Sequence, residues 1–296
     1  MRNANFDEAT LRKLNQLSLV ATQVRAGVMK GDRRSTKRGT SVEFADYRDY
    51  TPGDDLRRLD WNVYARLDRP FIKLLEEEED LAVHVLVDAS KSMAWGEGDQ
   101  NKLRYALRLA AAIGAIALGT GDRLTTAVLQ AGKVQQQYGP WRGSQHLMRL
   151  LAFLDGVQPA GLTDLNHSLR DYALAARRPG LAFVISDLFA AAGHQSGLAD
   201  LQGRGHEVTL VHVLSPDELD PPLAGDLRLV DVETGHEQDI SLDAGLRDLY
   251  RRRVSAWQEE IRESCQKRNV RYMQLNTEVA WDKVVLYEMR RAGVVK

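Results

Sequence analysis

Cysteine is almost absent from this sequence. Cys265 is the only one in the 296 residues, so no disulfide can form within the chain and nothing indicates an oxidising compartment. Long apolar runs are also missing: the longest uncharged one, residues 109–118, falls well short of the roughly 20 residues that a membrane span needs. The amino terminus is polar, and no apolar segment of the signal-peptide type follows it. We therefore expect a cytoplasmic protein without a membrane span.

An excess of charge of one sign is missing as well. The chain has 40 basic and 41 acidic residues and a net charge of −1, which gives no overall field for nucleic acid or for an anionic membrane. Neither GxGxxG after a strand nor GxxxxGK[ST] occurs, so no nucleotide-binding loop is indicated. No Cys or His cluster has the spacing of zinc ligands. Any recognition by charge must be local, and nucleic acid is not an expected partner.

The apolar patterning that is present predicts an α/β fold. Apolar residues at helical spacing from Leu11 to Val28 predict an opening amphipathic helix. After residue 80, apolar runs typical of strands covered on both faces alternate with amphipathic segments. The predicted strands are residues 81–87, 123–130, 133–138, 181–186, 207–214 and 270–275, and the predicted helices are residues 102–118, 144–154, 164–177, a segment near 199, residues 244–268 and a terminal segment. This order predicts a doubly wound, mostly parallel sheet.

The first 80 residues have a different character. A basic loop, which we interpret as solvated or alternatively as a docking patch, contains Lys30, Arg33, Arg34, Lys37 and Arg38. In residues 42–69, aromatic residues alternate with about equal numbers of acids and bases, which argues against a groove for single-stranded nucleic acid. Structural ion pairs are the favoured role there, and Arg48, Arg57 and Arg66 are candidates for partner contact. We predict an accessory segment, 1–80, and an α/β domain, 81–296, with a hairpin insertion near 226–240.

Oxygen-bearing side chains follow three of the predicted elements. Asp88, Ser90 and Ser92 come directly after the first strand of the domain, Thr163 lies in a loop that opens a helix, and Asp187 follows residues 181–186. Ligands of open α/β sheets bind beyond the carboxyl ends of the strands, so we expect these side chains at one edge. Oxygen-only donors suit Mg²⁺ or Mn²⁺. Because most of these donors are neutral hydroxyls, such a metal would attract one more carboxylate, which a partner's Asp or Glu could supply.

These residues resemble a known metal site. Asp88-Ala89-Ser90-Lys91-Ser92 is similar to the DxSxS element of the metal-ion-dependent adhesion site in von Willebrand factor A-type (vWA) domains, with Thr163 and Asp187 in the places of its threonine and second acid. Lys91 stands where a glycine is usual, which alters access to the metal and makes Lys91 a candidate for partner contact.

The residues before the predicted α/β domain indicate a particular family. The segments 43–44, 48–57, 60–61 and 65–66, which include Arg48-Asp49-Tyr50-Thr51-Pro52-Gly53-Asp54-Asp55 and Asp60-Trp61, resemble the hallmark of the bacterial domain-of-unknown-function family 58. This resemblance implies a vWA domain after the block and a role as an adaptor or co-chaperone for a MoxR-type AAA+ ATPase. Many members have two amino-terminal membrane helices. This chain resembles the shorter branch without them.

We therefore predict a metal-dependent protein-binding module and no enzyme. The alternative is a metal-dependent phosphoryl-transfer enzyme or phosphatase with Asp88 as its nucleophile. Such enzymes need a second carboxylate two residues on as general acid, and this chain has Ser90 there. A serine hydrolase is disfavoured because Ser90 lacks the glycines of a nucleophile elbow.

Overall fold

The computed structural model describes residues 8–21, 42–51, 54, 59–77, 81–222, 225–232, 235–242 and 244–296, with the side chains of 42–48, 73–77, 240, 242 and 244 left out. The chain forms two compact units. One comprises Met1–Lys30 and Leu81–Lys296, and the other comprises Gly31–Asp80. We describe each unit by itself.

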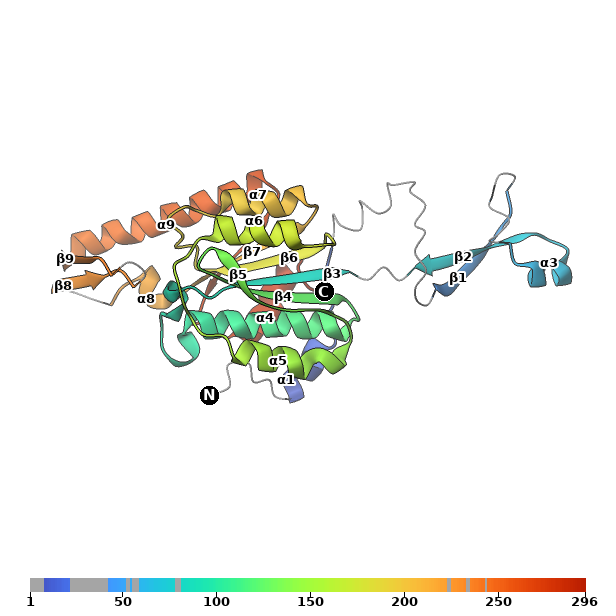
Figure 1. Ribbon diagram of the computed structural model, residues 1–296, viewed down its shortest axis with the longest axis horizontal. Coiled ribbons are helices and arrows are strands. Elements are labelled where there is room, and N and C mark those ends of the chain that lie inside the picture. Colours follow the sequence, from blue (N-terminus) through green and yellow to red (C-terminus); the bar gives the residue numbers. More distant parts are fainter. Residues whose placement is uncertain are drawn as a thin grey trace. The chain divides into compact units, whose positions relative to one another are not determined.

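A six-stranded sheet is the centre of the larger unit (Figure 1). Its strands are β3 (Ala82–Asp88), β4 (Arg123–Gln130), β5 (Lys133–Trp141), β6 (Leu181–Ser186), β7 (Glu207–Leu214) and β10 (Arg271–Asn276). They lie in the order β10-β7-β6-β3-β4-β5, and every neighbouring pair is parallel except β4 with β5. The mostly parallel sheet predicted from the sequence is therefore confirmed.

The strand order creates a switch point between β3 and β6. From β3 the chain builds the sheet outward through β4 and β5, and it then returns to the other side of β3 to add β6, β7 and β10. Open α/β sheets bind ligands at the carboxyl ends of the two strands where this reversal occurs. In this chain those strands end at Asp88 and Ser186.

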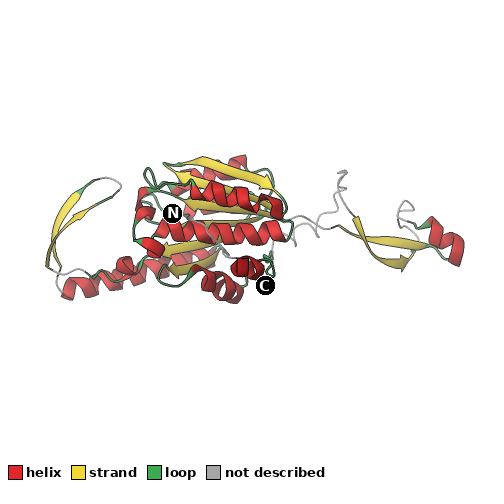
Figure 2. Ribbon diagram, turned by 90° about the horizontal axis from the view of Figure 1, so that it is seen from below, coloured by secondary structure: helices red, strands yellow, loops and turns green. Residues whose placement is uncertain are grey.

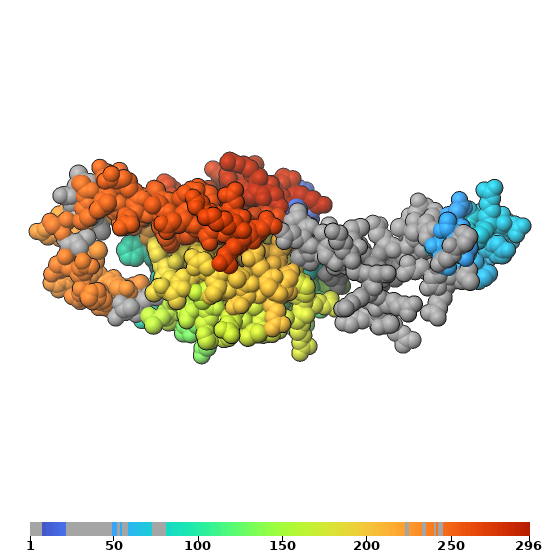
Figure 3. All heavy atoms as spheres, turned by 90° about the horizontal axis from the view of Figure 1, so that it is seen from above, coloured from blue at the N-terminus to red at the C-terminus, as the bar shows by residue number. Residues whose placement is uncertain are grey.

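Helices cover both faces of the sheet (Figures 1 and 2). Those on one face are α1 (Glu8–Leu14), α4 (Lys102–Gly119), α5 (Leu147–Asp155) and a terminal helical segment of α10 (Trp281–Lys283), the π-helix η5 (Val284–Glu288) and α11 (Met289–Arg291). Those on the other face are α6 (Leu165–Ala175), α7 (Gln195–Gly203) and α9 (Ala244–Lys267). Seen from that side, α9 lies in orange along the surface (Figure 3). The doubly wound fold class is confirmed.

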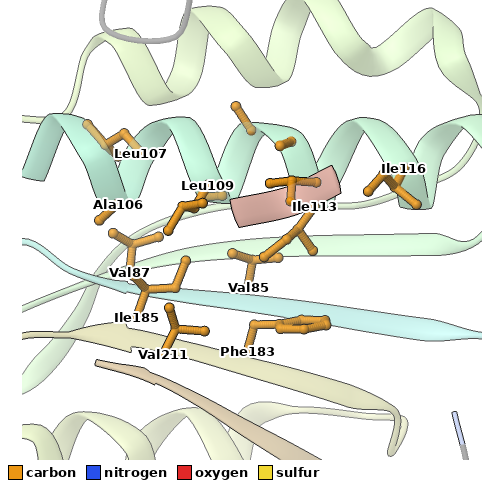
Figure 4. Packing of buried hydrophobic residues seen from close by; sticks show 14 of the residues in the cluster. Val85, Val87, Ala106, Leu107, Leu109, Ile113, Ile116, Phe183, Ile185 and Val211 are labelled. Atoms are coloured by element: carbon orange, nitrogen blue, oxygen red, sulfur yellow. The ribbon is translucent and has the colours of Figure 1, made fainter. Parts of the chain in front are cut away.

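Helix α4 is buried along nearly its whole length, because it packs against the middle of the sheet. Its Leu109 and Ile113 face Val85 and Val87 of β3 (Figure 4), and all four side chains are fully buried. Burial of each such side chain stabilises the fold by about 1.5–3 kcal/mol. This tightly packed layer fixes the start of α4, and with it Lys102, relative to the carboxyl ends of the strands.

The remaining short elements of the larger unit are 3₁₀ turns, a short helix and a hairpin. They are η2 (Lys91–Ala94), η3 (Gly98–Gln100), η4 (Ser144–His146), α8 (Pro216–Leu219), β8 (Gly225–Val230) and β9 (Glu237–Leu242). Strands β8 and β9 pair with each other in an antiparallel manner, and part of the predicted turn at 233–235 lies outside the described residues.

The smaller unit contains β1 (Val42–Asp49), α3 (Trp61–Leu67) and β2 (Phe71–Glu77). The two strands are antiparallel, and Asp60 caps α3 by accepting hydrogen bonds from the backbone N–H groups of Asn62 and Val63. These contacts make Asp60 the N-cap of α3. The predicted basic loop, the Pro52-Gly53 turn, Asp55 and Arg57 lie outside the described residues.

The opening helix is shorter than its periodicity predicts. Helix α1 ends at Leu14, and the following residues extend toward the end of the chain, where Leu19 forms a β-bridge with Val295. The backbone N–H of Val20 donates to the carbonyl of Val294. The helical prediction is wrong for residues 15–21: the N–H groups of residues 15–17 bond back to α1, and those of Ser18 and Val20 bond to carbonyls at the chain end. Residues 22–28 lie outside the described part. In the described residues no helix has both the length and the apolar character for a membrane span.

Candidate functional site

Asp88 is the centre of the switch point. Its register position in β3 places it beside Ser186 of β6, whose hydroxyl donates to Oδ2 of Asp88 at 2.7 Å. The other carboxylate oxygen, Oδ1, accepts the backbone N–H of Ser90 at 3.0 Å. The Asp88 residue is only 2% exposed. Both oxygens are therefore fixed by neighbours from two adjacent strand ends.

Hydroxyl groups extend the site from Asp88 toward the loop before α6. Ser90 Oγ lies 3.0 Å from Ser92 Oγ, and Ser92 Oγ lies 3.5 Å from Oγ1 of Thr163. Backbone hydrogen bonds tie the two loops together: Lys91 N–H donates to the carbonyl of Gly161, and Ala160 N–H donates to that of Ala89. These contacts bring together three of the predicted hydroxyl ligands although 71 residues separate Ser92 from Thr163.

Gly161 permits the close approach of these loops. Its φ is +77°, a left-handed conformation that residues with a Cβ rarely adopt. A Cβ at this position would lie 3.0 Å from Cβ of Ala131. Glycine is thus required at the point where the Thr163 loop passes the β4–β5 turn.

The carboxylate of Asp187 forms an ion pair that could not be predicted from the sequence motif. The ammonium group of Lys102, at the start of α4, lies 2.6 Å from Oδ2 of Asp187 and 2.5 Å from Oε1 of Glu218. The side chains of Lys102 and Asp187 are fully buried, and that of Glu218 is 14% exposed. Oδ1 of Asp187 accepts the backbone N–H of Phe189 at 3.2 Å.

Glu218 is itself held in place by a capping box on α8. The hydroxyl of Ser215 accepts the Glu218 N–H, and Oε2 of Glu218 accepts the Ser215 N–H at 2.9 Å. The sequence does contain signals for this network: Ser215-Pro216-Asp217-Glu218 has the S-x-x-E pattern. Lys102 falls at helical spacing with the buried Ala106 and Leu109, which marks a lysine on a buried face.

His212 supports the backbone of Asp187 from β7. Its Nε2 lies 3.1 Å from the carbonyl oxygen of Asp187, and its Nδ1 lies 2.7 Å from the hydroxyl of Tyr272. A carbonyl can only accept, so Nε2 donates the proton and Nδ1 accepts from Tyr272. Burial lowers the pKa of His212 to about 3, which keeps the ring neutral.

The environment disfavours a charge on Asp88. Burial, and then the proximity of the Asp187 carboxylate, raise the pKa of Asp88 to about 7, although the hydrogen bonds from Ser186 and Ser90 act in the opposite direction. Burial likewise raises the pKa of Glu218, against the opposing effect of Lys102. Carboxylates with raised pKa values in a cluster are typical of sites that bind or react.

The structure thus brings the predicted Asp88, Ser90, Ser92 and Thr163 into one chain of contacts, and places Asp187 beside them in an ion pair with Lys102. Among the described residues, no cluster of three or more His, Cys, Asp or Glu side chains suited to a metal is found, so the candidate donors are two carboxylates and hydroxyls.

The residues predicted to contact a partner are only partly described. Lys91 and Arg66 are exposed. The side chain of Arg48 and all of Arg57 lie outside the described residues.

The fold and site define a doubly wound α/β protein with a polar, oxygen-rich switch point. The sequence profile of a family described as "Protein of unknown function DUF58" matches residues 46–260, and the chain belongs to this family. Uncharacterized proteins of Mycobacterium tuberculosis and Mycobacterium bovis are 31% identical to it over 302 residues, which cover 100% of this chain and 94% of theirs. A shorter uncharacterized protein of Mycobacterium avium is 28% identical over 162 residues, which cover 53% of this chain and 95% of that protein.

One solved structure similar to this chain is that of the conserved hypothetical protein BatB from Bacteroides thetaiotaomicron. The two are 15% identical with a TM-score of 0.43, and the match covers 72% of this chain and 98% of that one.

Proposed function

We propose that this chain is a metal-dependent protein-binding module and not an enzyme. In this proposal Asp88, Ser90, Ser92, Thr163 and Asp187 hold Mg²⁺ or Mn²⁺, with Asp187 acting through water, in the manner of the vWA adhesion site that they resemble. The bound metal would supply a positive centre, and a carboxylate of a protein partner would complete its coordination shell.

The excess of buried negative charge is the observation that supports this proposal best. Asp88, Asp187 and Glu218 gather at the switch point, and Lys102 is the ammonium group that contacts two of these three carboxylates. Buried like charges repel one another and favour protonation unless a cation offsets them. A divalent cation between Asp88 and the hydroxyls would offset the excess, and hard cations of this kind prefer oxygen donors.

For the partner we propose a MoxR-type AAA+ ATPase, on the basis of the resemblance of residues 43–66 to the family's hallmark. The test is binding of a purified MoxR-type ATPase from the same genome to the immobilised full chain, in Mg²⁺ and in EDTA. We expect binding by the wild type in Mg²⁺ only, and none by Asp88→Ala.

Asp171→Ala is the matched control, because Asp171 is an exposed carboxylate on α6 away from the switch point. This variant should bind as the wild type does. Equal binding by wild type and Asp88→Ala, or binding that EDTA leaves unchanged, would contradict the proposal.

A phosphoryl-transfer enzyme with Asp88 as nucleophile fits the site less well. A nucleophilic carboxylate must be ionised and accessible, whereas Asp88 is buried with both oxygens hydrogen-bonded. Turnover of a generic phosphate ester by the wild type, lost in Asp88→Asn, would favour the enzyme instead.

A further inference from the structure

A cavity of about 220 Å³ lies between the loop after β6 and helix α9. Its walls are mainly the aromatic rings of Phe189, Tyr250 and Trp257 and the aliphatic side chains of Leu214 and Val254. Pockets for whole small molecules usually measure about 300–1,000 Å³. The smaller volume and apolar walls suit a single large apolar side chain.

Two walls of this cavity also contact the candidate metal site. Phe189 stacks on Trp257 with ring centroids 5.4 Å apart, and its ring centre lies 4.9 Å from Nζ of Lys102. Glu218, also in the wall, forms the second ion pair of Lys102. An occupant of the cavity would therefore lie directly beside the group that holds Asp187.

Exposed apolar side chains flank the site on all three loops that carry its proposed ligands. Trp95 follows Ser92 and is 51% exposed, Leu162 precedes Thr163 and is 53% exposed, and Phe189 follows Asp187 and is 43% exposed. Exposed apolar side chains gathered near one another on a protein surface mark sites that bind other proteins.

The charge at the cavity favours an acidic occupant. Arg253 lines the cavity, is exposed, and forms no ion pair within the part of the chain that the structure describes. Arg252, the preceding residue of α9, is also exposed, whereas Arg251 is paired with Asp220 and the Glu218 carboxylate in the cavity wall is paired with Lys102. A segment with acidic and apolar residues close together would complement both the rings and the arginine.

We infer that the cavity receives a large apolar side chain of the protein partner, from the same acidic segment whose carboxylate completes the metal site. This inference rests on the proposed function, and it specifies the partner's recognition element as an Asp or Glu with an aromatic or branched aliphatic residue near it.

The test uses short glycine–serine peptides that carry one Asp and one Phe at varied separations. Matched peptides replace Phe by Ala or Asp by Asn. Binding to the full chain is followed by ¹⁹F NMR of 5-fluorotryptophan, with the Trp257 resonance assigned through Trp257→Phe. Val254→Phe fills the cavity from α9, and Ser255→Phe places the same side chain on the exposed neighbouring position as the control.

In Mg²⁺ we expect the best Asp–Phe peptide to shift the Trp257 resonance and to bind the wild type roughly tenfold more tightly than its Ala counterpart. Val254→Phe should abolish this difference, and Ser255→Phe should preserve it. Equal affinity of the Phe and Ala peptides for the wild type, or no shift of the Trp257 resonance with any peptide, would overturn the inference. A Phe preference that persists in EDTA and without discrimination between Asp and Asn would uphold the cavity and overturn the metal site.

Discussion

Lys102 is the residue on which the electrostatics of the site depend. A fully buried ammonium group is tolerated only with partners, and Asp187 and Glu218 supply them at 2.6 and 2.5 Å. Breaking a buried ion pair by removal of one partner is far more costly than replacing all of its members, because the remaining charge stays buried without compensation.

We therefore expect Lys102→Met to lower the free energy of unfolding by about 3–5 kcal/mol. Addition of Asp187→Asn and Glu218→Gln to Lys102→Met should restore most of that loss. The measurement is urea unfolding, with Lys133→Met, an exposed lysine of β5, as the control. A Lys102→Met variant as stable as Lys133→Met would show that the ion pairs do not stabilise the fold.

Among the elements, the loop that carries Thr163 depends on a glycine at position 161. Gly161 combines a positive φ with a close approach to Ala131, whereas Gly98 has a φ of +56° and open space around it. Substitution at Gly98 therefore tests the effect of backbone strain alone, and substitution at Gly161 tests the effect of strain together with displacement of the loop.

Gly161→Ala should lower the free energy of unfolding by about 1–3 kcal/mol and should weaken metal binding, since the loop must move. Gly98→Ala carries conformational strain alone and should leave metal binding unchanged. The measurement is the increase in the thermal unfolding temperature on addition of Mn²⁺, compared between the Gly161→Ala and Gly98→Ala variants. Equal loss of the Mn²⁺ effect in both variants would contradict a positioning role for Gly161.

The central strands could be predicted from sequence because they are covered on both faces. The run at β6 is apolar up to its last residue, the run at β7 is mostly apolar, and the predicted bounds of both strands are confirmed. Since parallel strand ends share an edge, the grouping of Asp88 with Asp187 followed from topology, whereas the contact of Thr163 with Ser92 comes from the loop before α6. The ion pairs of Lys102 could not be predicted in this way, because Lys102 begins a helix and its partners are 85 and 116 residues away. The helix predicted to continue after Leu14 is wrong for the same reason. Backbone partners of this segment lie at the other end of the chain, and local periodicity contains no information about them.

At the scale of the whole molecule, buried histidines determine how stability responds to acid. Burial lowers the pKa of His84 to about 3 and that of His206 to about 4, and the two rings lie edge to face at 4.6 Å. An unfolded chain protonates these groups near pH 6.5, whereas the folded chain does not. The contribution of these two neutral histidines to the free energy of unfolding is therefore fully present above pH 6.5 and is lost as the pH falls toward 4.

At pH 5 each of these two histidines should reduce the free energy of unfolding by about 2 kcal/mol relative to pH 7. The variant His84→Gln/His206→Gln should show a correspondingly flatter dependence in urea unfolding between pH 7 and pH 5. His167→Gln, at an exposed position on α6, should keep the steeper wild-type slope. Identical slopes in all three proteins would refute this origin of acid sensitivity.

Residues 46–260 match a family described as being of unknown function, and the proposed binding of a partner depends on the metal. The most direct test is a titration of Mn²⁺ by electron paramagnetic resonance, in which bound Mn²⁺ loses its free-ion signal. We expect one saturable site in the wild type at a pH above the Asp88 pKa of about 7, no such site in Asp88→Asn, and an unaltered one in Asp171→Asn. Saturable binding that survives in Asp88→Asn, or the absence of saturable binding from the wild type, would contradict a metal site at Asp88.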